Sequence, residues 1–174
     1  MHGFLRFVGV LNAAVWLGAA CFFTLVAGPA FFSAEMLSFL PRPHAGRAAE
    51  VILQRLFLLQ QGCAVIALIH LGLEHFHSGR AVEKLTLALL VCLLGFGLAG
   101  GQWLLPKMHE LQRVRYGAQT TPAQKQQAAA EFASWHRASR VADLAALAAL
   151  MFYLWRLTRP AGGPRFAPLD KFKR

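Results

Sequence analysis

Four long apolar runs dominate the chain and predict four membrane-spanning helices. A hydrocarbon core of about 30 Å is crossed by roughly 20 helical residues, since each adds about 1.5 Å. The runs cover residues 7–32, 51–73, 85–105 and 141–157. We therefore expect an all-α, polytopic membrane protein. Its spans should lie at about residues 4–32, 50–74, 84–105 and 139–158.

Helical periodicity continues beyond the third and fourth runs. An apolar stripe extends from Pro106 to Gly117, and glycine commonly ends a helix. The residues from Thr121 to Gln124 then have the pattern of a capping box, which begins a helix. Helices three and four should therefore continue through residues 106–138 as an extramembrane helical hairpin.

The hairpin places pairs of residues opposite each other if its turn is centred on Gln119. Trp103 and Trp135 lie at equal distances from that centre, at the start of the two apolar runs. Tryptophans gather at membrane–water interfaces, so we expect this pair to form an aromatic belt at the boundary. Lys107 and Glu131 are also equidistant from the centre, and we expect them to form an ion pair.

Prolines and glycines mark the expected ends of the first two helices. Pro29 should kink or end the first helix near the far membrane surface. Segment 40–46 contains two prolines and a glycine, from which we expect a loop rather than a continuous helix. The second helix should then occupy about residues 48–77.

Composition supports a membrane protein and argues against a soluble one. Of the 174 residues, 56% are hydrophobic and only 15% are charged, against the ~25% charged residues of soluble domains. This length suits one transmembrane domain, residues 1–160, followed by a basic tail, residues 161–174. The net charge of +10 is distributed over loops and ends. We therefore expect contact with anionic lipid head groups and no nucleic-acid binding.

The same charge distribution bears on localisation. Four spans place both termini on one side of the membrane, and the basic residues divide evenly between the two sides. The dense basic cluster at residues 156–174 favours termini inside the cell, because basic loops stay cytoplasmic. Arginine outnumbers lysine, and alanine and leucine dominate, which indicates a GC-rich bacterial genome. We expect the bacterial cytoplasmic membrane.

A candidate polar site lies where the fourth span begins. His136, Arg140 and Asp143 recur at spacings that place them within an arc of about 60° on one helix face, and Ser139 borders it. An ionisable residue inside a span is costly and normally has a partner, which we expect to be Arg140 for Asp143. Functionally, the group would bind a proton, an ion or an anionic head group. Structurally, it would lock helix four to the bundle, and the sequence leaves both interpretations open.

A second polar group offers a possible metal or cofactor site. His70, Glu74 and His77 share a face, and two histidines with a carboxylate suit a transition metal such as zinc. They also lie where a helix leaves the membrane, and polar residues there need no special cause. No two histidines fall in different spans at matching depth for a bis-histidine haem. We expect no cofactor, with a transition metal or haem as the alternatives.

Small and aromatic residues indicate how the helices pack. Gly97 and Gly101 form a G-x-x-x-G pattern that lets a neighbouring helix approach closely. The surrounding glycines also match G-x-G-x-x-G, but a nucleotide site needs a strand before that motif. In the first span, Asn12 and Trp16 share a face, and with Pro29 they should shape the packing of that helix.

Several stretches together resemble a known family. They are residues 16–32, Gly46-Arg47, residues 102–106 and residues 132–144. The chain resembles the DUF4149 group of small bacterial membrane proteins, is similar to the eukaryotic transmembrane protein 205, and is more distantly similar to copper-resistance D-type proteins. The resemblance implies a four-helix polytopic protein and no particular reaction. That family often has Asn where this chain has Asp143, so the site here carries an added charge.

Three functions remain compatible with these observations. The first is a non-enzymatic accessory or scaffold subunit that acts through helix–helix association, as a homo-oligomer or with other membrane subunits. The second is a small transporter or an ion- or metal-handling protein that uses His136, Arg140 and Asp143. The third is a haem-dependent membrane redox protein. No set of catalytic residues occurs in a context that supports it, so an enzyme is the least favoured class.

Overall fold

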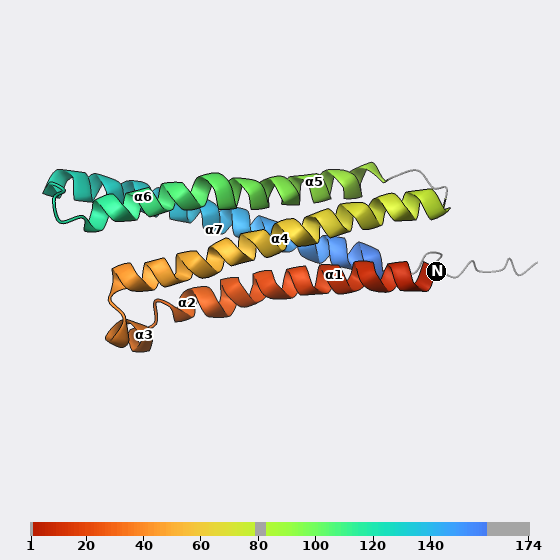
Figure 1. The fold of residues 1–174 in the computed structure, drawn as a ribbon, viewed down its shortest axis with the longest axis horizontal. Coiled ribbons are helices and arrows are strands. Elements are labelled where there is room, and N and C mark those ends of the chain that lie inside the picture. Colours follow the sequence, from red (N-terminus) through yellow and green to blue (C-terminus); the bar gives the residue numbers. More distant parts are fainter. Residues whose placement is uncertain (1, 79–82, 160–174) are drawn as a thin grey trace, which may run out of the picture.

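The computed structural model describes residues 2–78 and 83–159, and every regular element within these ranges is helical. Four helical rods lie side by side (Figure 1), and all four are long and apolar enough to cross a membrane. This confirms the predicted all-α, four-span architecture. The first rod is α1 (His2–Phe22), η1 (Phe23–Ala27) and α2 (Gly28–Ala30); the second is α4 (Arg42–Ser78); the third is α5 (Lys84–Ala99), η2 (Gly100–Leu104) and α6 (Leu105–Tyr116); the fourth is α7 (Pro122–Thr158).

The rods form an up-and-down bundle in which each has two principal neighbours. The first rod packs on α4 and α7, and the third rod packs on the same two helices from the other side. A short helix, α3 (Ala34–Phe39), connects the first two rods at the end away from the N-terminus (Figure 1). The 37 residues of α7 extend over about 55 Å, well beyond a ~30 Å hydrocarbon core. The bundle must therefore project from the membrane.

The core combines a few large side chains with many alanines. Trp16, Leu90, Leu150 and Tyr153 are the largest side chains that are fully buried, and they come from three of the rods. Alanines of α1 and α4 belong to the same buried cluster. Small residues let helix backbones approach closely where no hydrophobic effect drives helices together. Large apolar side chains cover the outer faces, as expected of helices that face lipid.

Gly9 allows α1 and α4 to approach closely around His70. The His70 imidazole is only 4% exposed, and its Nε2 donates a hydrogen bond to the Leu5 carbonyl at 2.7 Å. A Cβ added at Gly9 would lie 2.7 Å from that same Nε2. One turn further along, the Asn12 amide donates to the Cys63 carbonyl at 2.9 Å. Buried polar groups thus fix the register of these two helices.

The glycines of the third rod also face α4 of the same chain. Gly97 lies against Gln61, and Gly101 against Phe57, so the predicted G-x-x-x-G face is covered within the protomer. The tightest contact is at Gly100, where an added Cβ would collide with the Phe57 ring. A π-helical segment begins at Gly100 and changes the angular spacing of the following residues. The face that needs small residues therefore includes Gly100.

Proline shapes both rods that contain a π-helical segment. Pro29 follows η1 and Pro106 follows η2. A proline donates no hydrogen bond, and its ring collides with the carbonyl four residues before it. In both rods the residue before the proline donates five residues back, Gly28 to Phe23 and Leu105 to Gly100. The first rod ends soon afterwards at Ala30, as Pro29 predicted, whereas the third continues to Tyr116.

Two expectations about local structure were wrong. Helix α4 begins at Arg42 rather than near residue 48, so most of segment 40–46 is helical. Pro43 lies in the first turn, where the missing N–H has no partner to lose. Lys107 does not pair with Glu131; its Nζ lies 3.9 Å from Glu110 of its own helix. These pairs lie on an exposed surface, where an ion pair contributes little.

The hairpin between α6 and α7 follows the predicted plan. Helix α6 ends at Tyr116, before Gly117, and α7 begins after Thr121. The capping box is confirmed, because the Thr121 hydroxyl accepts from the Gln124 N–H at 3.3 Å and the Gln124 amide oxygen accepts from the Thr121 N–H at 3.0 Å. The predicted basic tail, residues 161–174, lies outside the described residues.

Polar contacts close the bundle at the end that holds the N-terminus. Arg6 donates to the Thr158 carbonyl at 3.0 Å and so joins the first and last rods. Arg156 donates to Glu83 at the start of α5. This hydrogen bond lowers the pKa of the Glu83 carboxyl, with a further contribution from Thr86. The candidate site lies toward the opposite end of the bundle.

Changing Gly9→Ala should destabilise the fold. The added Cβ must displace the buried His70 ring and stretch its bond to Leu5, and overpacking of this kind costs about 1–3 kcal/mol. Gly18→Ala is the matched control on α1, because a Cβ there has nothing within 4 Å. Thermal unfolding in a mild detergent should show a lower midpoint for Gly9→Ala only. Equal midpoints for the two variants would contradict the packing argument.

Candidate functional site

A cleft of about 600 Å³ occupies the end of the bundle away from the N-terminus. It exists because the first rod stops at Ala30 while the other three rods continue past that level. Its walls come from η1, α2, α4, α6 and α7, and most of the lining side chains are apolar. The π-helical segments contribute Thr24 on one side and Leu104 on the other.

Aromatic side chains form the inner end of the cleft. Phe57 of α4 and Phe96 of α5 meet edge to face, with their ring centroids 6.5 Å apart. Gln60 lies one turn further along α4 and also lines the cleft. Beyond these residues, the buried cluster around Trp16 and Tyr153 fills the bundle. The cleft therefore reaches the packed core, and its open end is on the hairpin side.

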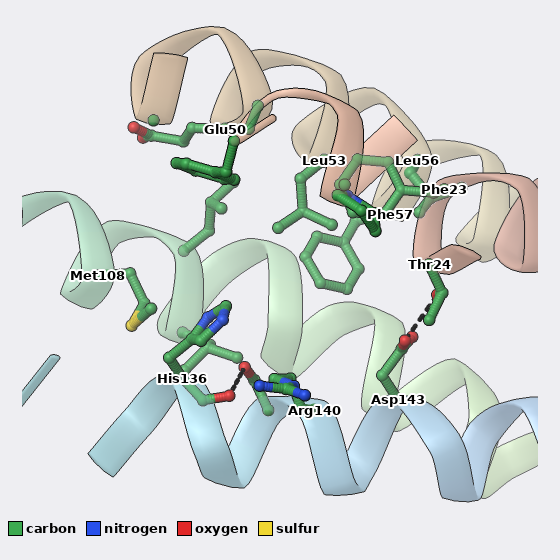
Figure 2. Close-up of a pocket in the computed structure, with 18 of the residues that line it drawn as sticks. Phe23, Thr24, Glu50, Leu53, Leu56, Phe57, Met108, His136, Arg140 and Asp143 are labelled. Atoms are coloured by element: carbon green, nitrogen blue, oxygen red, sulfur yellow. Dashed lines mark hydrogen bonds between the residues drawn. The ribbon is translucent and has the colours of Figure 1, made fainter. Parts of the chain in front are cut away.

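All four residues of the predicted polar site line this cleft. His136, Ser139, Arg140 and Asp143 project from α7, as their spacing predicts (Figure 2). The His136 ring stacks on Phe132 of the preceding turn, with centroids 5.9 Å apart and planes 10° apart. The Ser139 hydroxyl donates to the His136 carbonyl at 2.9 Å, so this hydroxyl is used within the helix. The His136 ring and the Arg140 guanidinium line the cleft and form no hydrogen bond with each other.

Asp143 is bound by Thr24 rather than by Arg140. The Thr24 hydroxyl donates to Asp143 Oδ2 at 2.7 Å and joins η1 to α7 (Figure 2). The expectation that Arg140 is the partner of Asp143 was therefore wrong. A hydrogen bond to an ionised group is shorter and stronger than a neutral one. This bond holds the loosened end of the first rod against the fourth.

Arg140 is consequently a cation without an ion-pair partner among residues 2–78 and 83–159. Its guanidinium lines the cleft beside His136 (Figure 2). The Arg140 side chain is exposed at the cleft, and a charged residue on a membrane-spanning helix normally has a partner. The unpaired guanidinium distinguishes this cleft from ordinary helix packing.

A second polar cluster, Arg47, Glu50 and His109, lies on the facing side of the cleft. Arg47 donates to Glu50 at 2.8 Å, and His109 Nδ1 is 2.7 Å from the Arg47 guanidinium and 3.2 Å from Glu50. A guanidinium only donates hydrogen bonds, so His109 Nδ1 must accept in its 2.7 Å contact with Arg47. Arg47, rather than His109, is then the donor to Glu50. Sequence reasoning missed this cluster, since 59 residues separate Glu50 from His109. Only the contact of α4 with α6 brings them together.

The remaining predicted residues lie elsewhere in the bundle. His70 is bound to Leu5, and His77 donates to the Leu73 carbonyl at 3.0 Å. Within the described ranges, no three His, Cys, Asp or Glu side chains are grouped to hold a metal. Metal binding by His70, Glu74 and His77 stays a prediction.

The predicted aromatic belt has a definite geometry. Trp103 and Trp135 lie edge to face, with their ring centroids 5.0 Å apart. Both belong to the rods that carry the hairpin, and His136 directly follows Trp135 in α7. Pro29 of the first rod lines the cleft itself. The boundary that the tryptophans predict therefore passes through the region of the cleft.

These features define a polytopic helical membrane protein with a mostly apolar cleft at one end, to which α7 contributes polar side chains. The chain belongs to the family described as "Domain of unknown function (DUF4149)", whose profile matches residues 11–117. That match begins within α1, covers the rest of the first three rods and ends before α7, which carries His136, Arg140 and Asp143. Comparison with curated proteins and with solved structures gave no match. The likeness to transmembrane protein 205 and to copper-resistance D-type proteins stays a prediction.

Replacing Thr24→Val should destabilise the fold by about 1–2 kcal/mol, because it keeps the side-chain shape and leaves the Asp143 carboxylate without its donor. Asp143→Asn should cost less, since the amide still has an oxygen to accept from Thr24. Ser139→Ala is the control, as it removes only a bond within α7. Unfolding in detergent, followed by tryptophan fluorescence, measures all three. Strictly additive effects in a Thr24→Val, Asp143→Ala double variant, where each change alone removes the bond, would contradict a direct bond.

Proposed function

We propose that this membrane protein binds a small ligand in the cleft and belongs to the transport or ion-handling class. The observation that carries the proposal is Arg140, a cation without an ion-pair partner among the described residues, beside His136 in a mostly apolar cleft. The volume of about 600 Å³ falls within the range of roughly 300–1,000 Å³ that small-molecule sites have. A ligand with negative charge would supply the missing counter-ion.

The shape of the cleft favours a binding site over a channel in a single chain. Its inner end meets the packed side chains of the core, so it does not pass through the bundle. Transport by this chain would need an oligomer or a movement of the rods. We expect the first rod to be the one that moves. At the cleft it is joined to α7 through the hydrogen bond of Thr24, and breaking this bond would release it.

The orientation of the chain in the membrane determines on which side the cleft opens. With both termini in the cytoplasm of a bacterium, the hairpin and the cleft lie at the outer face of the cytoplasmic membrane. Lys107, Arg113 and Arg115 of α6 are then available to anionic lipid head groups on that face.

Two other functions are supported by fewer observations. An accessory or scaffold role is supported by the projecting hairpin of α6 and α7, but the Gly97 and Gly101 face is occupied by α4 and offers no surface to a partner. A haem-dependent role would draw on His109 and His136, which line the same cleft. The short contact of His109 Nδ1 with Arg47 speaks against it. A visible absorption spectrum of the purified protein tests the haem hypothesis.

Native mass spectrometry after mild extraction tests the proposal. We expect a bound small molecule on the wild-type protein and its loss in Leu53→Trp, because Leu53 lines the cleft and the larger ring fills it. Leu58→Trp is the matched control on α4, since Leu58 is exposed on the outside of the bundle and does not line the cleft.

Three results would contradict the proposal. They are a wild-type protein that carries no small molecule, a ligand that both tryptophan variants retain, and a ligand that both lose. A co-purifying protein in place of a small molecule would favour the accessory-subunit function.

A further inference from the structure

We infer that the ligand of the cleft is a single-chain amphiphile with an anionic head group, taken up from the bilayer, with Arg140 binding the head group. This inference rests on the proposed function and names its ligand class. It follows from three properties of the cleft: the order of polar and apolar residues along its walls, the balance of its charges, and the way it meets the lipid-facing surface.

Two walls change from polar to apolar toward the core. Along α4, Glu50 is followed by Leu53 and Leu56, with Gln60 as the polar residue at the inner end, and along α6 the direction toward the core leads from His109 to Leu105. The fourth rod contributes the polar side chains of His136, Arg140 and Asp143 (Figure 2), and Asp143 is bound by Thr24. A ligand that matches these walls has one polar end and one apolar end. A hydrated inorganic ion would leave the apolar part of the cleft unfilled.

One side chain of the cleft has the chemistry to bind an anion. Two carboxylates also line the cleft: Glu50 is paired with Arg47, and Asp143 accepts from the Thr24 hydroxyl, which satisfies its oxygen without neutralising its charge. Arg140 alone among the charged lining residues is left without a partner in the described chain. Its fork of N–H donors matches the two oxygens of a carboxylate or phosphate. Neutral His136 adds a further possible donor on the same face.

The cleft is continuous with the surface that faces lipid. Leu25, Phe32 and Leu144 line the cleft and are each at least half exposed on the outside of the bundle. These positions border the gap above Ala30, where the first rod has ended. A chain lying in the bilayer can therefore enter sideways without leaving an apolar environment. This geometry selects a membrane amphiphile over a soluble anion.

The size of the cleft selects one chain rather than two. A volume of about 600 Å³ lies within the range of roughly 300–1,000 Å³ that sites for drug-sized molecules have. A single acyl chain with its carboxylate is a molecule of that size. A phospholipid with two chains is more than twice as large.

Binding of tritiated palmitate to the protein in phosphatidylcholine nanodiscs tests this inference. Arg140→Gln should weaken binding about tenfold or more, the effect of removing one charge-assisted contact. Arg140→Lys should retain part of the affinity because it keeps the charge. Arg137→Gln is the matched control, since Arg137 is exposed on α7 and does not line the cleft, and it should bind like wild type.

Competition distinguishes the sources of the ligand. Unlabelled palmitate should displace the label, whereas hexadecanol and inorganic phosphate should not, because each lacks one half of the recognised chemistry. Equal competition by hexadecanol, or an equal loss in Arg137→Gln, would overturn the assignment of Arg140 to the head group. Displacement by phosphate would instead point to a soluble anion.

The two proposals can fail separately. If palmitate does not bind but Leu53→Trp still releases another small molecule, the amphiphile inference is wrong and the cleft remains a ligand site. If no small molecule is found by either experiment, the proposed function is wrong as well.

Discussion

The fold depends on the requirement that every backbone polar group inside a membrane finds a partner within the protein. Four helices meet this requirement along nearly their whole length. Pro29 and Pro106 each remove one donor, and in both cases the preceding residue bonds five positions back to form a π-helical turn. Both turns border the cleft. The positions where backbone bonding is least regular therefore coincide with the candidate site, which is where π-helical turns are often found in proteins.

The shortness of the first rod follows from the same constraint and has the larger consequence. After Pro29 the chain ends its helix at Ala30, then turns through α3 before Arg42 begins α4. Three rods are left to enclose a space that four would fill. A packed bundle has few voids of more than a water molecule, so an opening of about 600 Å³ needs a cause, and the missing helical wall supplies it.

The sequence predicted what depends on local pattern and missed what depends on contacts between distant residues. Run length and periodicity predicted the four helices, spacing placed His136 and Arg140 on one face, and the capping box at Thr121 was correct. The predicted partner of Asp143 was wrong. Arg140 is close to it in the sequence, whereas the actual partner, Thr24, is 119 residues away.

Other misses have similar causes. The start of α4 was misplaced because prolines were treated as helix breakers, although the first turn tolerates them. The role of Gly100 depends on the π-helical turn that begins there, and a regular helical count passes over it. The Glu50–His109 contact required knowledge of which rods are neighbours. In each case the local sequence is compatible with more than one arrangement, and packing between rods selects one.

The lack of an ion-pair partner for Arg140 among the described residues is the strongest argument that the cleft is more than a packing defect. A purely structural role would be served by an ion pair with Asp143, one turn away, which would neutralise both groups. Instead Thr24 satisfies Asp143, and the guanidinium is left facing the cleft. The Arg140 guanidinium is exposed at the cleft and has no ion-pair partner among the described residues. A bound anion would supply that partner, and a ligand that binds only the folded protein stabilises it.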